Sequence, residues 1–124
     1  MSGLQEIRNT VQAVAEAVAA ALHIDTEIVD ETLTIVAGTG RYMEKIGAKE
    51  EDGDLKSGYL YSEVLRTGRA YIIEDVKNHP NYAPKENELA EVCCPIMYDG
   101  RAIGLMGLVA FTEEQRSRLL GSKE

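Results

Sequence analysis

Residues 92–111 decide the fold, and they read Val92-Cys93-Cys94-Pro95-Ile96-Met97-Tyr98-Asp99-Gly100-Arg101-Ala102-Ile103-Gly104-Leu105-Met106-Gly107-Leu108-Val109-Ala110-Phe111. Two mostly apolar runs flank the pair Asp99-Gly100. Asp-Gly between apolar runs is a strong hairpin signal, because a type I′ turn requires positive φ at both of its central residues. The stretch therefore predicts two antiparallel strands, Cys93–Tyr98 and Arg101–Phe111.

Alternation along these strands predicts two apolar faces. The first face holds Cys94, Ile96 and Tyr98 of the first strand, with Ile103, Leu105, Gly107, Val109 and Phe111 of the second. The second face holds Cys93, Met97, Ala102, Met106 and Leu108. A hairpin that is apolar on both faces lies inside a sheet and is covered on both sides, by helices, by a partner chain or by a segment that closes over a ligand.

The size and charge of the chain narrow its class. The 124 residues, 44% of them hydrophobic, suit one globular domain with one core. The formal net charge of −8, from 13 basic and 21 acidic residues, argues against direct contact with nucleic acid or with an anionic membrane surface. No apolar run approaches the roughly 20 residues of a membrane-spanning helix, and the N-terminus lacks the pattern of a secretory signal. The expected location is the cytoplasm.

The two cysteines, Cys93 and Cys94, are adjacent. Neighbouring residues on a strand point to opposite faces, so these thiols are poorly placed to bind one metal ion or to form an unstrained disulfide. We expect reduced, buried thiols with a packing role, and a redox-active thiol is the alternative.

An amphipathic helix is predicted over residues 3–22, because apolar residues recur there at spacings of three and four without a proline. The apolar stripe also follows a heptad, so it fits either packing on a sheet or a seam between the helices of a dimer. We expect a homodimer through this helix. The stripe residues that carry this expectation are Leu4, Ile7, Val11, Val14 and Val18.

The rest of the chain alternates short strands, helices and loops. Two β-branched runs, Ile24–Val29 and Leu33–Val36, predict a second hairpin. A helix is predicted over Gly58–Gly68, with Ser57 as its N-cap and the last glycine as its C-terminal signal. The other expected elements are a loop or short helical turn over Arg41–Lys56, a strand over Ala70–Glu74, a long connection over Asp75–Glu88 and a helix that begins after the N-cap Thr112. This order indicates an α+β sandwich, with an antiparallel sheet between helices and a face covered by the long loop.

This order of elements, with several local motifs, resembles the GAF domain, a small-molecule sensor related in architecture to PAS domains. The motifs are the N-terminal helix, Ile35–Gly40 after the first hairpin, Gly58–Gly68 with its Val-Leu-x-Thr-Gly ending, Tyr71–Glu74, Pro95-Ile96 followed by Gly100, Ile103 and Gly104, and Gly107-Leu108. The resemblance covers nearly the whole chain. It implies an α+β fold in which an antiparallel sheet lies between terminal helices and a lidded, ligand-binding face.

More narrowly, the chain looks like the N-terminal sensory module of bacterial enhancer-binding activators that act with the sigma-54 type of sigma factor. In such proteins the sensory domain precedes an AAA-plus ATPase and a helix-turn-helix. Residues 108–116 look like the exit helix toward that motor. The resemblance thus implies that residues 1–124 form one sensory domain of a longer regulator.

The resemblance places the ligand over the sheet, against the short helix of residues 58–68. It implies a mostly apolar wall with a few hydroxyl groups, although the same side chains also suit a plain core with hydroxyls at its rim. The identity of the ligand is open. The expected ligand-binding residues are Tyr42, Met43, Tyr59, Tyr61, Tyr71, Ile73 and Cys94.

No metal site and no catalytic group are expected. Some similar modules carry extra cysteines before the Pro-Ile strand, whereas residues 76–91 contain none. His79 in the long loop has no Ser or Cys partner at a recognisable spacing. The segment Gly38–Arg41 resembles part of a phosphate loop but lacks the Lys-Ser/Thr that follows. The segment Glu50–Asp54 resembles part of a calcium loop but lacks the closing glutamate.

Three functions compete at this point. A regulatory sensor would transmit ligand binding to an attached output domain by repacking the terminal helices. A structural dimerisation module with a vestigial pocket is the first alternative. An enzyme that reduces methionine sulfoxide is the second, but attack and resolution need thiols that can meet, and Cys93 and Cys94 point apart. We therefore expect a non-enzymatic sensor.

Overall fold

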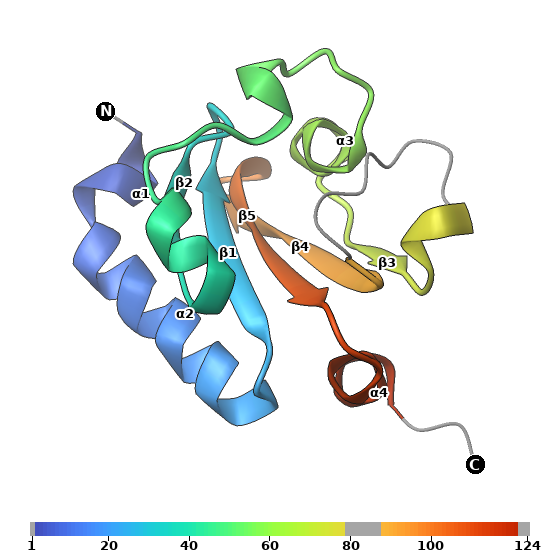
Figure 1. Ribbon diagram of the computed structural model, residues 1–124. Helices are drawn as coiled ribbons and strands as arrows, with labels where there is room; N and C mark the ends of the chain where they lie inside the picture. Colours follow the sequence, from blue (N-terminus) through green and yellow to red (C-terminus); the bar gives the residue numbers. More distant parts are fainter. Residues whose placement is uncertain (1, 79–87, 122–124) are drawn as a thin grey trace.

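The computed structural model describes residues 2–78 and 88–121. Its centre is one antiparallel sheet with the strand order β2-β1-β5-β4-β3 (Figure 1). The strands are β1 (Asp25–Asp30), β2 (Ile35–Gly38), β3 (Tyr71–Ile73), β4 (Ala90–Tyr98) and β5 (Arg101–Ala110). The α-helices are α1 (Gly3–Glu6), α2 (Arg8–Leu22), α3 (Leu60–Thr67) and α4 (Glu113–Leu120), and the short 3-10 helices are η1 (Gly40–Lys45), η2 (Glu50–Gly53) and η3 (Val76–Asn78). The α+β fold predicted from the sequence is confirmed.

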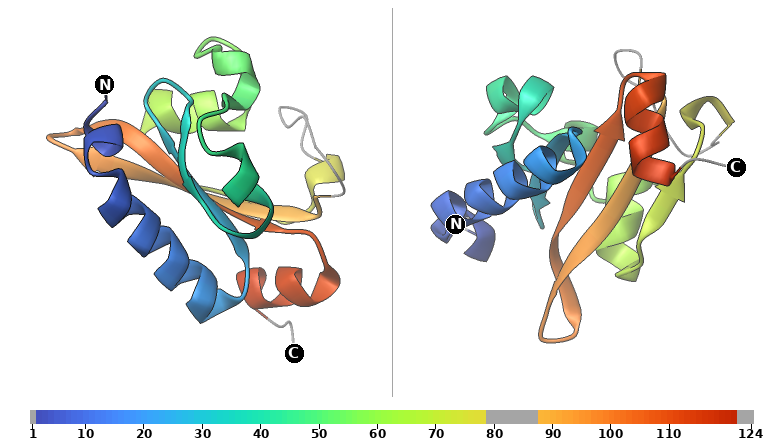
Figure 2. Two further views of the ribbon diagram at one scale, coloured as in Figure 1. Left: turned by 60° about the vertical axis from the view of Figure 1, so that its left-hand side comes forward. Right: turned by 90° about the horizontal axis from the view of Figure 1, so that it is seen from below.

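The hairpin of β4 and β5 forms the middle of the sheet, as predicted. Its turn has φ of 53° at Asp99 and 80° at Gly100, and these two positive values fit the type I′ geometry that the Asp-Gly pair predicts. The two strands are paired from Ala90 with Ala110 to Tyr98 with Arg101. The tip of this hairpin projects well beyond the rest of the sheet (Figure 2).

The predicted division of the hairpin into faces is wrong for most of β4. A β-bulge between Ile96 and Met97 shifts the register by one residue, so Cys93 pairs with Gly107 and Cys94 pairs with Met106. A one-residue shift exchanges the faces of a strand, because side chains alternate with a period of two. Cys93 therefore shares the face of Gly107, and Cys94 lies on the opposite face. The sequence reading assumed an unbroken ladder from the turn.

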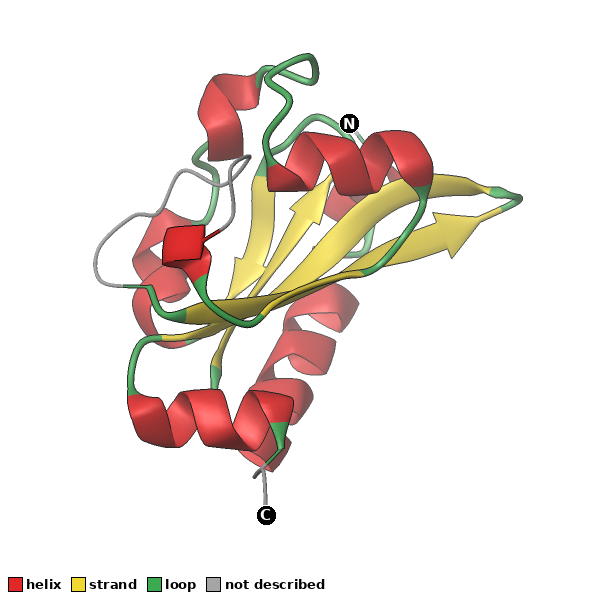
Figure 3. Cartoon of the chain, turned by 90° about the vertical axis from the view of Figure 1, so that its right-hand side faces the viewer, coloured by secondary structure: helices red, strands yellow, loops and turns green. Residues whose placement is uncertain are grey.

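Helices cover both faces of the sheet: α3 lies on one side, and α2 and α4 lie on the other (Figure 3). Each side has its own apolar core. The core on the α3 side consists of Val29, Leu33, Ile35, Leu60, Tyr61, Val64, Ile73, Val76, Cys93 and Leu105. The core on the α2 side consists of Leu4, Val11, Ala15, Ile28, Val36 and Ala37.

The predicted N-terminal helix is present in two parts, because Ile7 leaves helical geometry with φ of −116° and ψ of 31°. Two side chains of the first part hold it to the end of β1. The Ser2 hydroxyl donates to Asp30 Oδ2 at 2.7 Å, and Gln5 Nε2 donates to the same oxygen at 2.6 Å. In α2, Gln12 exchanges two hydrogen bonds of 2.9 Å with the backbone of Gly38, which covers the end of the edge strand β2.

Helix α3 is capped by a residue other than the predicted N-cap. The carboxylate of Glu51 in η2 accepts from the backbone N–H of Tyr61 at 2.6 Å and of Ser62 at 3.1 Å. The predicted cap, Ser57, instead donates its hydroxyl to Glu51 at 2.7 Å. A carboxylate at a helix N-terminus satisfies free N–H groups and interacts favourably with the helix dipole. The predicted C-terminal signal is correct, since Gly68 has φ of 68°.

Replacing the distant cap tests how firmly α3 is held. In Glu51→Ala, two backbone donors of α3 lose their acceptor, so we expect the free energy of unfolding to fall by about 1–2 kcal/mol. Urea unfolding followed by circular dichroism measures the change. The matched control is Glu44→Ala, which removes an exposed carboxylate of η1 and should stay within about 0.5 kcal/mol of the parent. Equal losses in both variants would contradict the capping role.

Candidate functional site

Two acidic side chains are buried beneath α3. Glu27 of β1 is fully buried, and Glu91 of β4 is 2% exposed. The hydroxyl of Tyr61, on α3, donates to Glu27 Oε2 at 2.8 Å. Acidic side chains are rarely buried unless they are paired or serve a function. We call Glu27, Glu91 and Tyr61 the acidic site.

A glycine at the centre of β5 makes room for the acidic site. Gly107 pairs with Glu27 of β1 on one side and with Cys93 of β4 on the other. A Cβ atom at Gly107 would lie 2.4 Å from Tyr61 Oη and 3.1 Å from Glu91 Oε2. Glycine inside a strand commonly marks such a close approach. The tyrosine hydroxyl reaches the floor of the sheet because this position has no side chain.

One oxygen of Glu27 lies away from conventional donors. Among the residues that the structure describes, no N–H or hydroxyl group donates to the buried Glu27 Oε1, and the Glu27 side chain instead shares a hydrogen bond with the carboxyl group of Glu50. A buried polar atom without a donor costs about 1–3 kcal/mol. Native proteins rarely retain such an atom without a reason such as a ligand, an ordered water or a catalytic role. The two buried acids therefore mark this site as the leading candidate for function.

Burial and mutual repulsion raise the pKa values of both acids. For Glu27 the largest cause of the raised pKa is burial, followed by the carboxylates of Glu50 and Glu91 and by a hydrogen bond with the Glu50 side chain, whereas the hydrogen bond from Tyr61 partly opposes the rise. For Glu91 burial again raises the pKa most, and a hydrogen bond with Tyr61 partly opposes the rise. Glu88 and Glu50 raise the pKa of Glu91 further. The site therefore retains protons more readily than exposed glutamates do.

The residues predicted to bind a ligand fall into three groups. Tyr42, Tyr61 and Ile73 are buried, and Tyr71 packs at the edge of the α3-side core. Met43 and Tyr59 are 57% and 42% exposed. Cys94 is exposed on the other face of β4, which separates it from the rest. Their binding role stays a prediction, and the structure brings Tyr61 into direct contact with Glu27.

Sequence reasoning missed Glu27 and Glu91. A signal was present, because each lies in step with the apolar side chains of its own strand. Glu27 alternates with Val29, and Glu91 alternates with Cys93. An acid at an inward position of a strand is the pattern that identifies them. The sequence analysis assigned no role to either residue.

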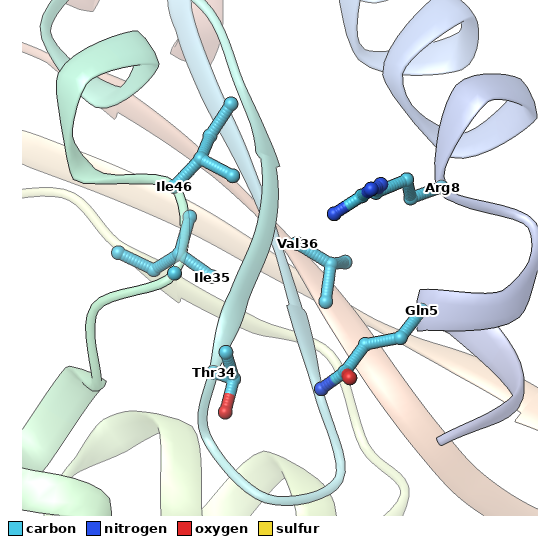
Figure 4. A pocket seen from close by; sticks show the side chains of 7 residues that line it. Gln5, Arg8, Thr34, Ile35, Val36 and Ile46 are labelled. Atoms are coloured by element: carbon cyan, nitrogen blue, oxygen red, sulfur yellow. The ribbon is translucent and has the colours of Figure 1, made fainter. Parts of the chain in front are cut away.

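A hollow lies away from the acidic site, between the start of α2 and the edge strand β2 (Figure 4). Its volume is about 130 Å³. Arg8 and Gln5 approach it from the helices, and Thr34 and Val36 from the strand region. The hollow contains none of the predicted ligand-binding residues.

The other motifs of interest have structural explanations or lie outside the described residues. Arg41 lies 3.9 Å from Asp25 and stacks on Phe111, so it belongs to a surface ion pair and a ring contact. The acidic loop supplies the α3 cap through Glu51. His79 lies outside the described residues. Within residues 2–78 and 88–121, no group of three or more His, Cys, Asp or Glu side chains is arranged to hold a metal ion.

Comparison with known proteins identifies the family. The GAF domain family matches residues 4–121. The chain belongs to the GAF domain family. A relative from Escherichia coli K12, described as a putative uric acid sigma-54-dependent transcriptional regulator (UacR), is 32% identical over 123 residues. This match covers 95% of the present chain but 20% of the relative, so the chain spans about a fifth of that regulator.

Solved structures share the GAF fold. The type II free methionine-R-sulfoxide reductase of Thermoplasma acidophilum has a TM-score of 0.69 at 20% identity, over 94% of this chain and 86% of that one. The GAF domain of the Acinetobacter phosphoenolpyruvate-protein phosphotransferase has a TM-score of 0.64 at 18% identity, with coverages of 91% and 74%. The nlh2 GAF domain of A. aeolicus has a TM-score of 0.63 at 17% identity, with coverages of 93% and 80%. At these identities the likeness concerns the fold alone.

The raised pKa of Glu27 predicts a pH-dependent stability. In the folded state the Glu27 carboxyl group keeps its proton above pH 4.5, the usual pKa of a glutamate. In the unfolded chain it releases the proton near that pH. Stability is therefore lost as the pH rises from that value through the folded pKa. We expect Glu27→Gln to be more stable than the parent at pH 8, and this advantage to shrink at pH 5. Urea unfolding at both values measures it, with Glu44→Gln as the exposed control. A constant difference between Glu27→Gln and the parent at the two pH values would contradict the raised pKa.

Proposed function

We propose that this GAF domain is the small-molecule-sensing module of a sigma-54-dependent transcriptional activator in the cytoplasm. Its ligand regulates an attached AAA-plus and DNA-binding output. The match to a sigma-54-dependent regulator over nearly the whole chain supports the class of protein. No described helix is long and apolar enough to cross a membrane. The domain itself makes no contact with nucleic acid in this proposal, in keeping with its net charge of −8.

The structural observation that carries the proposal is the burial of two acids, Glu27 and Glu91, beneath α3. A core that served only for packing would place apolar residues at these positions and avoid the cost. Glu27 instead lies beneath α3, where the sequence predicts the ligand. Tyr61, one of the predicted ligand-binding residues, touches it directly. Tyr42 and Ile73 complete the buried part of the proposed binding set.

The sheet offers a path from the acidic site to the terminal helices. Glu27 faces α3, whereas its neighbour Ile28 belongs to the core beneath α2. Helix α4 follows β5 after the N-cap Thr112, whose hydroxyl accepts from Gln115 N at 3.1 Å. A ligand that moves β1 relative to β5 would therefore shift the bases of both helices. Two packings that differ by a few kcal/mol suffice for a switch.

Ligand screening tests the proposal directly. We expect at least one compound from a panel of cytosolic amines, nucleobases, urate and organic acids to raise the midpoint of thermal unfolding by several degrees, because ligands that bind only the folded state stabilise it. Differential scanning fluorimetry measures the shift. Urate belongs in the panel because the related regulator is named for uric acid. If no compound shifts the midpoint, the domain is a dimerisation module with a vestigial pocket.

The exposed side of α2 supports the proposed homodimer. Ile7 and Val14 are 52% and 45% exposed, and they lie seven positions apart, which is the spacing of one heptad. Val18 is half-buried beside them. Leu4 and Val11 of the predicted seam are instead buried in the core of the domain. We therefore assign the seam to Ile7, Val14 and Val18 alone.

A charged substitution on this seam should separate the subunits. Val14→Glu places a carboxylate between the two helices, so we expect the dimer to dissociate at least tenfold more readily. Sedimentation velocity over a range of concentrations measures this. Ala13→Glu adds the same charge to an exposed neighbouring position of α2 and should leave the association unchanged. A dimer that tolerates Val14→Glu would place the interface elsewhere.

The reductase alternative lacks a supporting observation. Cys93 is buried and Cys94 is exposed, and the register places them on opposite faces of β4. Burial and nearby carboxylates raise the pKa of the Cys93 thiol, which disfavours the nucleophilic thiolate. The resemblance to methionine sulfoxide reductases is a resemblance of fold. A regulatory role therefore accounts for more of the structure.

A further inference from the structure

We propose that the hollow between the start of α2 and the edge strand β2 binds a short-chain carboxylate, whose carboxylate group pairs with the guanidinium of Arg8. The hollow has a volume of about 130 Å³, and its walls come from α1, α2, β2 and the segment after η1. It lies away from the acidic site, so the inference goes beyond the ligand proposed above. It is drawn from the charge of Arg8, from the polar groups around the hollow and from the apolar side chains that line it.

Arg8 is a cation without an acid partner. The arginines that lie beside a carboxylate are Arg41, Arg66, Arg101, Arg116 and Arg118. The side chain of Arg8 instead makes no ion pair and no hydrogen bond with any residue that the structure describes. It extends from α2 toward β2, on the side of Val36 (Figure 4). None of the residues that line the hollow is acidic, so the guanidinium is open to an anion from solvent.

Polar groups around the hollow add donors and a second positive charge. Gln5 Nε2 donates one of its two N–H groups to Asp30 Oδ2 at 2.6 Å, so its second N–H is available to a ligand. Lys49 Nζ donates to the hydroxyl oxygen of Thr32 at 3.3 Å, and this oxygen lies 2.8 Å from Thr34 Oγ1 on the wall of the hollow. An ammonium group thus lies near the same wall, and its charge favours an anion as well.

Asp30 is bonded to this wall, but its carboxylate is fully occupied. One oxygen accepts from Ser2 Oγ and Gln5 Nε2. The other accepts from the backbone N–H and the hydroxyl of Thr32 and from the backbone N–H of Thr34. The two oxygens of a carboxylate offer about four lone-pair sites in all. Asp30 therefore has no acceptor site left for Arg8, and an external carboxylate can take that place.

The size and the apolar lining of the hollow select the ligand. The volume is well below the roughly 300–1,000 Å³ of pockets that bind drug-sized molecules, so the ligand is small. Ile35, Val36 and Ile46 supply apolar surface beside the polar groups. The side chain of Ile46 is 42% exposed, so a hydrocarbon chain that covers it removes apolar surface from water. A guanidinium binds a carboxylate through two parallel hydrogen bonds. A carboxylate with a short hydrocarbon chain uses both features, whereas inorganic phosphate uses the charges alone.

Ligands of similar shape and different charge test the assignment. Butyrate and butyramide have the same number of non-hydrogen atoms, and butyrate alone carries a charge. Acetate keeps the charge and lacks two CH₂ groups. Each compound, and inorganic phosphate, is titrated into the ¹⁵N-labelled chain and followed by backbone amide NMR. We expect butyrate to shift the signals of Arg8, Val36 and Gly47 in a saturable manner. It should bind at least about fivefold more tightly than butyramide or acetate.

Substitutions that remove one feature at a time locate the binding. Arg8→Gln removes the charge and should weaken butyrate binding at least about fivefold without changing the binding of butyramide. The matched control is Arg69→Gln, which removes an exposed arginine outside the hollow that also has no partner among the described residues, and it should bind butyrate as the parent does. Ile46→Ser should weaken the binding of butyrate and leave that of acetate unchanged. Thermal unfolding checks that each variant is folded.

Three results would overturn the inference. The first is equal binding of butyrate and butyramide, and the second is an Arg8→Gln variant that binds butyrate as the parent does. The third is phosphate that binds as tightly as butyrate while Ile46→Ser has no effect, because the hollow then holds an adventitious anion only. The sensor function is tested separately. A thermal shift that Arg8→Gln abolishes belongs to the hollow, and one that persists in Arg8→Gln belongs to another part of the domain.

Discussion

The register of β4 against β5 controls what the interior of this domain contains. The bulge at Ile96 and Met97 exchanges the faces of most of β4, so Glu91 and Cys93 turn toward α3. Without it, the ladder from the Asp99-Gly100 turn would pair Cys93 with Met106 and turn these two residues toward the opposite face. Gly107 would then no longer lie in register between Glu27 and Cys93. The acidic site thus depends on one extra residue in a hairpin that is otherwise regular.

The cost of the acidic site is compensated by the core around it. Burial of two carboxyl groups destabilises the fold, since both are kept from water and repel each other. The ten buried residues of the α3-side core pack α3 against the sheet on the same side as the two acids. Glu51 of η2 also stabilises the position of that helix by capping its N-terminus. A well-packed frame of this kind offsets the cost of the buried acids.

Local signals in the sequence predicted most of the fold. The Asp99-Gly100 turn, the Thr112 cap, the Gly68 terminus and the apolar periodicity of residues 3–22 each act over a few neighbouring residues. The bulge depends on contacts across the sheet, and the Glu51 cap depends on contacts across a loop. No short sequence pattern predicts either feature. The same limit applied to the site. Tyr61 was predicted as a ligand-binding residue from the helix that carries it. Glu27 is recognised as a site residue only when the structure places Tyr61 and Gly107 beside it.

The alternation of a strand explains how such a site can act at a distance. Glu27 and Ile28 are adjacent, yet the first belongs to the acidic site and the second to the core beneath α2. A charge change at Glu27 therefore acts on the backbone that also positions Ile28. The exposed residues Ile7 and Val14 lie on the same helical unit that Ile28 supports. One strand and one helix thus separate the Glu27 carboxyl group from the proposed dimer seam. Packed elements transmit small displacements over such a separation without a flexible linker.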